Sequence, residues 1–461
     1  MAVIAGPEQT TGPQHGDDTP LPVPRLTVIG TGYLGATHAI CMAVLGFDVL
    51  GVDVDESKIK RLSEGEVPFF EPGLPQLLAK ATDSGRLRFT TSFEEAAEFG
   101  DIHFICVGTP QQQGSDAADL RYVDSAVTAL AQHLRRRTLV VGKSTVPVGT
   151  AARLTELVRR LAPAGDQVEL AWNPEFLREG FAVDDTIRPD RLVFGVSSTG
   201  AEERLRAAFA PVIATGTPVV VTDLTTAELV KVAANSFLAT KISYINAMAE
   251  VCEATGGDVR GLARALAYDD RIGGRFLKPG LGFGGGCLPK DIRAFAHRAE
   301  ELGVGQAVAF LREVDAINMR RRSRTVELIR ELAGGGDLTG VRVAALGAAF
   351  KPNSDDIRDA PALDVASALH RLGAHVTVVD PEATRNARRA HPELDYATDA
   401  ISAATGADVV ALLTEWNQFQ EIDPDIMGSV VAHRRIFDGR DALDATRWRA
   451  AGWEYRALGR P

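Results

Sequence analysis

Seven short β-rich runs alternate with segments of helical pattern from Arg25 to about Val221. The runs are Leu26–Ile29, Val49–Val52, Ile102–Val107, Leu139–Gly142, Val168–Ala171, Leu192–Gly195 and Val219–Val221. Strands that alternate with helices in this way form parallel sheets with helices on both faces. The pattern therefore predicts an α/β domain with a doubly wound sheet over residues 25–221.

A long helical segment follows this domain. Thr225-Thr226-Ala227-Glu228 fits a capping box with Thr225 as N-cap, and Gly256-Gly257 ends the helix. About 30 residues give a helix of roughly 45 Å, apolar around most of its axis. Such a helix commonly links domains or forms a subunit interface. Helical pattern continues from Asp291 to about Leu332, so we expect a central helical domain over residues 222–333.

A second α/β pattern begins after the linker Gly334-Gly335-Gly336. Its expected elements are the strands Val341–Leu346, His375–Val379, Val409–Leu413 and Arg435–Asp438 and the helix Ala362–Leu372. Both halves of the chain show the order strand, turn, helix, Leu-Gly, strand and terminal Asp, which suggests two related nucleotide-binding folds. The predicted fold is α/β, with two Rossmann-like doubly wound domains (25–221 and 338–461) joined by a central helical domain with a long connecting helix.

Composition limits the environment and the partners. Residues 1–24 are rich in polar residues, Gly and Pro, which is typical of a disordered tail and not of a signal peptide. The net charge of −11 disfavours nucleic acid and anionic membranes as partners. The uncharged stretch Leu26–Phe47 is long enough to cross a bilayer, but its four glycines favour a buried strand–turn–helix unit.

Cysteine usage indicates a reducing compartment. Cys41, Cys106, Cys252 and Cys287 show no CxxC spacing and no disulfide framework, so we expect a cytoplasmic protein. The sequence also lacks a paired His/Cys cluster, and no metal site is expected.

The turn Gly30-Thr31-Gly32-Tyr33-Leu34-Gly35 lies between the first strand and its helix, and Asp53 ends the next strand. Gly30 permits the tight turn, Gly32 lets a pyrophosphate approach the backbone, and Gly35 allows close helix packing. The carboxylate of Asp53 suits a ribose diol and would repel a 2′-phosphate, which favours NAD over NADP. Lys58 either assists at the ribose or a phosphate, or is a solvated surface lysine. A structural turn without a ligand is the alternative interpretation.

The corresponding turn of the second half, Gly347-Ala348-Ala349-Phe350-Lys351-Pro352, lacks this glycine pattern. A lysine stands where the glycine-rich cradle would be. This turn therefore suits a phosphate or a base-sugar ligand different from NAD.

Cys287 follows the glycine-rich run Gly282-Phe283-Gly284-Gly285-Gly286 and opens a helix with Pro289 in its first turn. A cysteine at a helix N-terminus beside Lys290 is expected to have a lowered thiol pKa and to act as a nucleophile. Asp291 lies four residues on and shares its face. The other three cysteines are interpreted as small buried apolar residues.

Several ordered motifs carry a resemblance to a known family. They are Gly30 to Gly35, Phe70-Glu71-Pro72-Gly73-Leu74, Val107-Gly108-Thr109-Pro110, Lys143-Ser144-Thr145-Val146-Pro147, Asn173-Pro174-Glu175-Phe176, Glu228 through Asn235, Gly282 through Asp291, and Ala349-Phe350-Lys351-Pro352. From about Arg25 to Leu443 the chain resembles the UDP-glucose/GDP-mannose dehydrogenase family.

The resemblance implies an NAD-dependent four-electron oxidation of UDP-glucose at C6. Cys287 would capture the aldehyde as a thiohemiacetal, and a second hydride transfer would give a thioester that water hydrolyses. Lys231 and Asn235, four apart on the long helix, would stabilise negative charge on the C6 oxygen. Glu175 would act as general base or order a water through Thr145, and Asp291 would activate or orient water. Glu179, expected on the same helical face as Glu175, would support it.

The resemblance also assigns binding residues and a partner. The cofactor residues are Gly30, Gly32, Tyr33, Leu34, Gly35, Asp53, Lys58, Thr109, Thr145, Glu179 and Lys290. The substrate residues are Glu175, Phe176, Leu177, Lys231, Asn235, Arg271, Phe276, Leu277, Lys278, Gly284, Phe350, Lys351 and Arg440. Arg271 matches an arginine that family members lend to the neighbouring subunit, which implies a homodimer.

Two departures from the family pattern keep alternatives open. The family often has Ser before the cysteine and an aromatic residue after it, whereas this chain has Gly286-Cys287-Leu288. The Cys287-to-Asp291 run also occurs in the GDP-mannose branch, while Asp270-Arg271-Ile272-Gly273 and the glycine spacing favour UDP-glucose. GDP-mannose and UDP-N-acetylhexosamines remain alternative substrates. A two-electron dehydrogenase with a structural Cys287 and a non-catalytic nucleotide-sugar-binding protein remain alternative functions.

Overall fold

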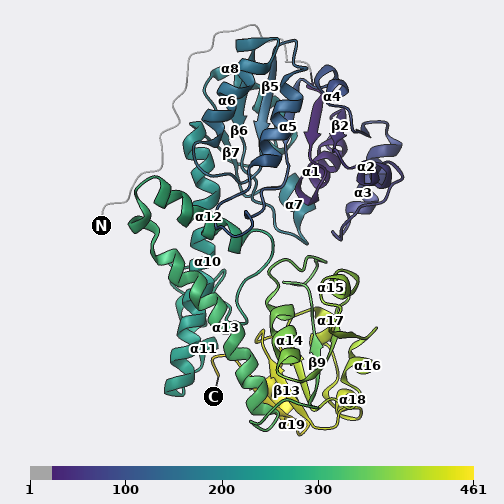
Figure 1. Ribbon diagram of the computed structural model, residues 1–461, viewed down its shortest axis with the longest axis vertical. Coiled ribbons are helices and arrows are strands. Elements are labelled where there is room, and N and C mark those ends of the chain that lie inside the picture. Colours follow the sequence, from purple (N-terminus) through teal and green to yellow (C-terminus); the bar gives the residue numbers. More distant parts are fainter. Residues whose placement is uncertain (1–22, 461) are drawn as a thin grey trace.

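A computed structural model describes residues 23–460, in which two sheet-containing domains are joined along one side by a set of helices (Figure 1). The tail predicted over residues 1–24 lies outside the described residues except for its last two. The prediction of two α/β domains with a helical region between them is confirmed.

The N-terminal domain is built on an eight-stranded sheet with the order β3-β2-β1-β4-β5-β6-β7-β8. The strands are β1 Leu26–Ile29, β2 Val49–Val52, β3 Leu87–Thr90, β4 Ile102–Ile105, β5 Thr138–Gly142, β6 Val168–Trp172, β7 Leu192–Gly195 and β8 Val219–Thr222. The helices are α1 Tyr33–Val44, α2 Glu56–Ser63, α3 Leu74–Asp83, α4 Phe93–Phe99, α5 Arg121–Ala131, α6 Thr150–Leu161, η1 Gly165–Gln167, α7 Ala182–Ile187, α8 Thr199–Ala208 and α9 Ala210–Ile213.

Helices cover both faces of this sheet, as the strand alternation predicts. Leu26 and Val28 of β1 pack with α1 and α3 on one face, while Ile29 joins α5 and α6 on the other. The uncharged stretch Leu26–Phe47 forms β1 and α1. Within residues 23–460, no helix is long and apolar enough to cross a membrane.

The sheet departs from the predicted parallel arrangement at one place. β6 and β7 are antiparallel and meet at Trp172 and Gly195. Between them the chain runs through a loop and the six-residue α7, without the full crossover helix that a parallel neighbour requires. This loop carries Glu175 to Glu179. The sequence analysis also missed the short strand β3.

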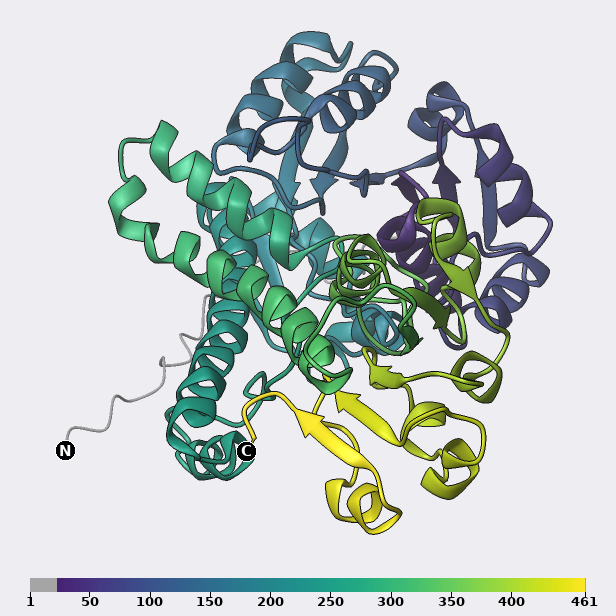
Figure 2. The same cartoon turned by 60° about the horizontal axis from the view of Figure 1, so that its bottom comes forward.

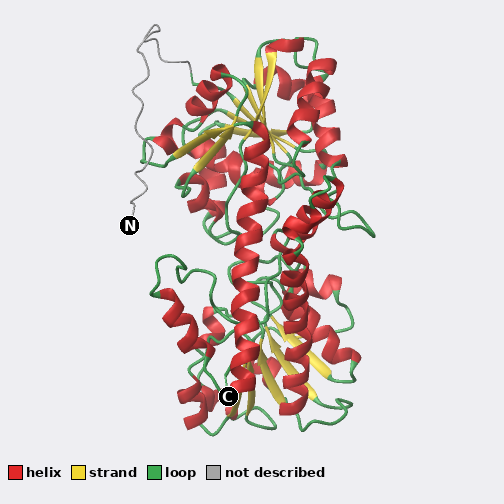
Figure 3. Cartoon of the chain, turned by 90° about the vertical axis from the view of Figure 1, so that its left-hand side faces the viewer, coloured by secondary structure: helices red, strands yellow, loops and turns green. Residues whose placement is uncertain are grey.

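The central region consists of α10 Leu224–Thr255, α11 Val259–Ala267, α12 Leu288–Glu301, η2 Gly305–Val308 and α13 Phe310–Leu332. The 32-residue helix α10 runs from the upper sheet to the lower one (Figure 3). Both α12 and α13 lie beside it (Figure 2). Gly256 ends α10 with a φ of 75°, a conformation that glycine adopts without strain.

The predicted capping box at the start of α10 is wrong. Asp223 caps the helix by accepting the N–H of Thr226 at 2.8 Å. Glu228 turns away from its own helix and accepts the N–H groups of Gly149 at 2.8 Å and Ala151 at 2.6 Å. It therefore satisfies the N-terminus of α6 in the N-terminal domain, a tertiary contact that the local sequence does not reveal.

The C-terminal domain has a six-stranded parallel sheet with the order β11-β10-β9-β12-β13-β14. The strands are β9 Arg342–Leu346, β10 His375–Val379, β11 Asp395–Tyr396, β12 Val409–Leu412, β13 Arg435–Asp438 and β14 Glu454–Ala457. The helices are α14 Pro361–Arg371, α15 Thr384–Ala390, α16 Ala400–Ala404, α17 Asn417–Gln420, α18 Pro424–Gly428 and α19 Ala445–Ala450. The loop after β9 contacts the N-terminal domain, since Ser354 donates to Glu179 and the Asn353 carbonyl lies against Gly180.

Candidate active site

Cys287 is the N-cap residue of α12, as the sequence predicts. The glycine run Gly282 to Gly286, which precedes Cys287, packs closely against the C-terminal domain. A Cβ at Gly284 would collide with the carbonyl of Asp359, and one at Gly285 would reach the Phe350 ring at 2.8 Å. These glycines therefore allow the loop that carries Cys287 to pass directly under the C-terminal domain.

Lys231 faces Glu175 from the buried side of α10. The Lys231 ammonium lies 3.6 Å from a Glu175 carboxylate oxygen and 5.5 Å from the centroid of the Phe176 ring. The other Glu175 oxygen accepts the N–H of Leu177 at 2.8 Å. These contacts join α10 to the loop that follows β6.

Asn235, one turn after Lys231, is joined to α12. Its amide donates to Asp291 at 2.6 Å, and the Lys290 ammonium contacts the other Asp291 oxygen at 2.5 Å. Lys231, Asn235 and Asp291 are all buried. The sequence prediction that Lys231 and Asn235 face one site agrees with these contacts.

The charges of the site depend on one another. Burial raises the pKa of Glu175, and Lys231 only partly offsets this effect. Burial alone would lower the pKa of Lys231, but the negative charges of Glu175, Cys287 and Asp291 outweigh it and raise that pKa. The site therefore holds a firmly protonated amine beside a carboxylate that is harder to ionise than usual.

The expected lowering of the Cys287 pKa is wrong for this structure. The side chain reaches solvent, but surrounding protein atoms raise the pKa of the thiol through desolvation. Lys231 and Lys290 oppose this shift, and Asp291 adds to it. The helix position and the two nearby lysines do not overcome the desolvation and the nearby carboxylate.

The turn after β1 has space for a ligand. A Cβ at Gly32 would meet nothing within 4 Å, and no side chain caps the first N–H groups of α1 there. By contrast, Gly30 has a φ of 90° and a Cβ at Gly35 would collide with the Gly30 carbonyl. The conformation of Gly30 and the close packing at Gly35 agree with the prediction, and the uncapped start of α1 is suited to bind an anionic group.

Asp53 lies at the end of β2 and is buried beside the turn. Its carboxylate accepts the N–H of Thr31 at 2.8 Å and contacts the Lys58 ammonium at 2.8 Å. Burial raises the pKa of Asp53, but the bonds from Lys58 and backbone N–H groups outweigh it and lower that pKa. Lys58 is therefore engaged with Asp53, and the ionised carboxylate is suited to accept ribose hydroxyls.

A partly open pocket lies between this domain and α12. Thr109, Thr145, Lys290 and Asp291 are among its lining residues. The Thr109 hydroxyl donates to the carbonyl of Thr145 at 2.8 Å, which fixes the loop after β5. The pocket brings predicted cofactor residues next to the predicted water-activating carboxylate.

Three family models match the chain in order. They are the NAD binding domain (residues 24–213), the central domain (225–320) and the UDP binding domain (344–445) of the UDP-glucose/GDP-mannose dehydrogenase family. The chain belongs to the UDP-glucose/GDP-mannose dehydrogenase family. Its cofactor is NAD, held by the NAD binding domain of that family.

Individual relatives resemble the chain over nearly its whole length. A UDP-glucose 6-dehydrogenase of Rhizobium meliloti (strain 1021) is 42% identical, over 95% of this chain and 100% of the relative. The structure of a UDP-glucose dehydrogenase from Pyrobaculum islandicum matches with a TM-score of 0.87 and 37% identity, over 95% of this chain and 98% of that one. A UDP-D-ManNAc dehydrogenase from Pyrococcus horikoshii matches with a TM-score of 0.83 and 26% identity, over 95% and 99%.

The family's UDP binding domain places its predicted substrate residues at the interdomain boundary. Buried Arg440 donates to the carbonyls of Leu413 at 2.7 Å, Phe350 at 3.2 Å and Gly282 at 3.3 Å. Lys351 is half-buried, and desolvation lowers its pKa although Glu179 and Cys287 oppose this. Cations from the C-terminal domain therefore approach the loop that carries Cys287.

The loop from Phe276 to Lys278 is split between core and surface. Leu277 packs in a hydrophobic cluster with Ile245 and Val259, whereas Lys278 is exposed. Phe276 has a φ of 66°, which is rare for a bulky residue. Such backbone geometry is often found at binding loops.

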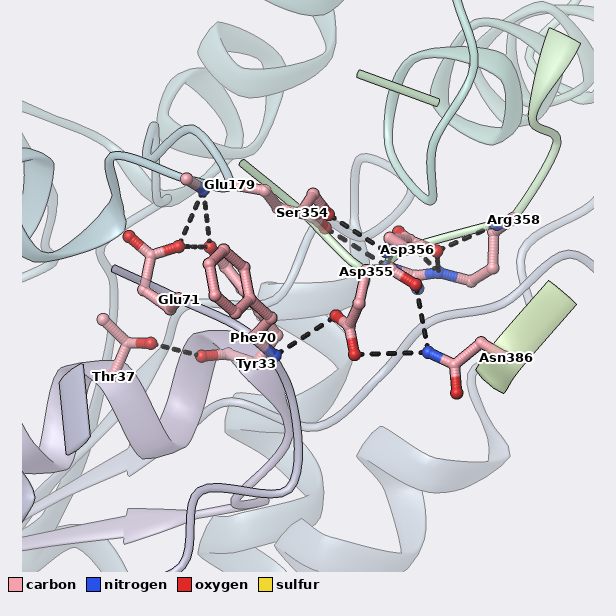
Figure 4. Close-up of polar contacts among 11 residues, drawn as sticks. Tyr33, Thr37, Phe70, Glu71, Glu179, Ser354, Asp355, Asp356, Arg358 and Asn386 are labelled. Atoms are coloured by element: carbon pink, nitrogen blue, oxygen red, sulfur yellow. Dashed lines mark hydrogen bonds and ion pairs between the residues drawn. The ribbon is translucent and has the colours of Figure 1, made fainter. Parts of the chain in front are cut away.

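Glu179 does not share a helical face with Glu175, because residues 173–178 are extended loop. Its carboxylate accepts the Ser354 hydroxyl at 3.0 Å and lies 3.3 Å from Arg358 of the C-terminal domain (Figure 4). Burial and the nearby Asp356 raise the pKa of Glu179 to about 7, although Arg358 and Ser354 oppose them. Glu179 thus links the two domains.

Arg271 lies apart from these residues. Its guanidinium is exposed and pairs with Asp269 at 2.6 Å. The loop that carries it is attached to α10 through the Lys241 ammonium, which donates to the carbonyls of Ile272 and Gly273. Within one chain, the site is formed without Arg271.

Three residues at the site were given no role from sequence. The Arg358 guanidinium lies against Gly286, next to Cys287. Lys143 is buried and donates to the Asn173 side chain at 2.8 Å, two residues before Glu175. Glu71 accepts the N–H groups of Gly180 and Ala182. Lys143 and Glu71 both lie in motifs that carry the family resemblance, and that was the signal available for them.

Proposed function

We propose that this chain oxidises UDP-glucose to UDP-glucuronate in two successive hydride transfers at one site. The observation that carries this proposal is the position of Cys287 at the start of α12, on the same turn as Asp291 and within the electrostatic influence of Lys231. Relatives that are named UDP-glucose 6-dehydrogenase and align over nearly the whole chain support the substrate.

The protein's residues would divide the chemistry as follows. When bound, NAD⁺ accepts a hydride from C6. Glu175 takes the proton of the C6 hydroxyl in the first oxidation, and the Lys231 ammonium and the Asn235 amide stabilise the charge on the oxygen. The product of this step is a C6 aldehyde.

Cys287 then keeps the aldehyde in the site. The thiolate bonds to C6 and the oxygen takes up a proton, which gives a thiohemiacetal. Loss of a second hydride from C6, which a second bound NAD⁺ would accept, and release of the hydroxyl proton to solvent give a thioester. Asp291 takes a proton from a water that is ordered through Thr145, and the water oxygen bonds to C6 as the C–S bond breaks. The thiolate is released, and the acid loses its remaining proton to solvent to give the carboxylate product.

Substrate binding would use loops from all three parts of the chain. Phe176 and Leu177 lie after β6, Phe276 to Lys278 and Gly284 lie in the central region, and Phe350, Lys351 and Arg440 lie in the C-terminal domain. The cofactor would be held by Gly30, Gly32, Tyr33, Leu34, Gly35, Asp53, Lys58, Thr109, Thr145, Glu179 and Lys290. This arrangement supports domain limits of 25–221, 222–333 and 338–461.

We further propose that the chain forms a homodimer through α10. Phe237, Tyr244 and Val251 are 65%, 49% and 52% exposed and recur every seven residues, so they form one apolar stripe. The loop that carries Arg271 is attached to α10 beside this stripe. A two-fold interface here would allow Arg271 to reach the site of the partner subunit. The four free cysteines support a cytoplasmic location.

The test is a panel of sugar nucleotides with NAD⁺, monitored for NADH at limiting sugar nucleotide. We expect UDP-glucose to be oxidised with about two NADH per sugar, because each hydride transfer reduces one NAD⁺. Cys287→Ala should form no UDP-glucuronate, whereas Cys252→Ala, a change of a buried cysteine at the far end of α10, should retain acid formation. Acid formation by Cys287→Ala would overturn the mechanism.

Each alternative predicts a different result in the same panel. One NADH per sugar would indicate a two-electron dehydrogenase with a structural Cys287. Preferential oxidation of GDP-mannose or of a UDP-N-acetylhexosamine would show that this sugar nucleotide, and not UDP-glucose, is the substrate. Binding of the sugar nucleotide without NADH formation would indicate a non-catalytic nucleotide-sugar-binding protein.

A further inference from the structure

The Glu71 carboxylate lies where the cofactor turn and the loop after β6 meet (Figure 4). Its side chain is 3% exposed and accepts the N–H groups of Gly180 and Ala182, each at 2.7 Å. The Tyr33 hydroxyl also donates to it. One buried carboxylate thus holds two separate segments of the site, through charge-assisted hydrogen bonds of the stronger kind.

Tyr33 ties this carboxylate to the cofactor turn. It is the first residue of α1, directly after Gly32, so its backbone N–H belongs to the free set that faces the space beside the turn. Its ring contacts Phe69, with ring centroids 4.7 Å apart. The Gly180 N–H donates to the Tyr33 hydroxyl oxygen at 3.0 Å as well as to Glu71. Each of Tyr33, Glu71 and Gly180 therefore contacts the other two.

The loop after β6 is held from its other side by the C-terminal domain. Gly180 has a φ of 78°, and a Cβ there would lie 2.7 Å from the Asn353 carbonyl. Glu179 accepts the Ser354 hydroxyl. The Phe70 N–H, next to Glu71, donates to Asp355 at 3.2 Å. The loop and Glu71 thus lie between the cofactor turn and the C-terminal domain.

We propose that Glu71 is a positioning residue that couples the two ligand sites: cofactor bound at the turn fixes Tyr33, and through Glu71 this orders the loop from Glu175 to Ala182. A sugar nucleotide that then binds to the ordered loop loses less conformational entropy, so its affinity is higher. Linkage makes the effect reciprocal, so the sugar nucleotide raises the affinity for the cofactor by the same factor. The inference rests on the proposed function for the identity of the second ligand.

Tyr33→Phe is the informative variant. It removes the hydroxyl that joins the cofactor turn to Glu71 and Gly180, but it leaves the bonds from Gly180 and Ala182 to Glu71 in place. Glu71→Gln removes the charge and one acceptor, and a buried N–H then lacks its partner. Thr37→Val is the matched control. It removes a hydroxyl from the same helix, where Thr37 donates to the Tyr33 carbonyl at 2.8 Å, without touching Glu71.

Hydrogen exchange of the amides of residues 179–183 gives the first measurement. In the wild type and in Thr37→Val, NADH alone should slow exchange in this segment, although the segment is distant in sequence from the turn. In Tyr33→Phe, NADH should bind and leave exchange in the segment unchanged. If Tyr33 only stabilised the fold, Tyr33→Phe would speed exchange both with and without NADH, and NADH would still slow exchange in this segment.

The affinity for NADH with and without saturating UDP-glucose gives the second measurement, since this pair cannot react. The ratio of the two dissociation constants should be about five or more in the wild type and in Thr37→Val, a typical coupling between sites. It should fall to about one in Tyr33→Phe and in Glu71→Gln. A ratio of one in the wild type, or an unchanged ratio in Tyr33→Phe, would overturn the coupling. Absence of NADH formation from NAD⁺ and UDP-glucose in the wild type would overturn the proposed function instead.

Discussion

At the scale of single residues, Cys287 combines an exposed thiol with surroundings that disfavour its ionisation. Desolvation raises the pKa of the thiol, Asp291 adds to this shift, and Lys231 opposes it. Since the thiolate is the nucleophile that attacks alkylating agents, the reaction of Cys287 with iodoacetamide should accelerate with rising pH and show no plateau near neutral pH in the ligand-free protein. Mass spectrometry of the Cys287 peptide across a pH series measures this.

Lys231→Met provides the control for this pH profile. Loss of the ammonium removes the largest influence that favours the thiolate, so alkylation at a given pH should become slower. A plateau near neutral pH in the wild type would show that the thiol is activated without a ligand and would contradict the raised pKa.

Lys231 should also matter more to catalysis than to binding. Its ammonium faces Glu175 and is proposed to stabilise the charge on the C6 oxygen, which develops only during the reaction. Lys231→Met should therefore lower kcat by about 10²–10³-fold, the usual cost of removing one such donor. The KM for UDP-glucose should change less. A large rise in KM with kcat unchanged would instead assign Lys231 to ground-state binding.

At the scale of elements, Glu228 joins the central region to the N-terminal domain by capping α6 from α10. Glu228→Ala would leave the N–H groups of Gly149 and Ala151 without their buried acceptor. We expect a loss of about 1–3 kcal/mol in the free energy of unfolding of the N-terminal domain, because the N–H group of buried Ala151 would lack a partner and an unpaired buried N–H group is costly. Thermal unfolding followed by circular dichroism measures the loss.

Glu228→Gln should cause a smaller loss, because its amide keeps one oxygen that accepts an N–H. Its unfolding temperature should lie between those of the wild type and Glu228→Ala. Unfolding of Glu228→Ala at the wild-type temperature would show that the capping contact is not formed in solution.

Elements with a strong local signal could be predicted from the sequence. β1, β2, β7, β10 and β13 occupy the expected residues, because each is a short run that contains β-branched or aromatic residues. The start of α10 could not be predicted, since a local capping pattern at Thr225 competes with the tertiary partner that Glu228 finds in α6. The antiparallel pairing of β7 likewise depends on a loop whose path is set by distant contacts.

The same distinction holds for the candidate site. Residues whose role follows from backbone geometry, such as Gly30, Gly35 and Cys287, could be placed from motifs alone. The raised pKa of the Cys287 thiol could not be predicted, because it results from desolvation together with several charges on α10 and α12. Glu179 contacts Ser354, and Glu71 contacts Gly180, so each acts on a segment more than a hundred residues away in the chain. Sequence spacing contains no information on such contacts.

At the scale of the whole molecule, the site lies where both α/β domains meet the central helices. The NAD binding domain supplies the turn and Glu175, α10 and α12 supply Lys231 and Cys287, and the C-terminal domain closes over the glycine loop. In the proposed mechanism, two molecules of NAD⁺ enter in turn while the sugar stays bound to Cys287. The contacts of Glu179 with Ser354 and Arg358 join the domains at their boundary and would have to tolerate this exchange.

The proposed dimer can be tested with a mixture of two variants that are each expected to be inactive. Arg271→Ala should lose activity because the partner's site lacks its arginine, and Cys287→Ala because its own site lacks the thiol. In a mixture that is unfolded and refolded together, heterodimers contain one site with both residues intact. Activity should then return to about a quarter of the wild-type value, since half of the dimers each carry one intact site of two.

Two measurements decide how this mixture is interpreted. Tyr244→Asp places a charge in the apolar stripe of α10 and should give a monomer in sedimentation experiments, because an unpaired charge buried in an interface is unfavourable. The same change introduced into both inactive variants should abolish the recovered activity. Recovery that persists in monomers would place Arg271 outside the partner's site, and a mixture of dimers that stays inactive would mean that Arg271 serves the site of its own chain.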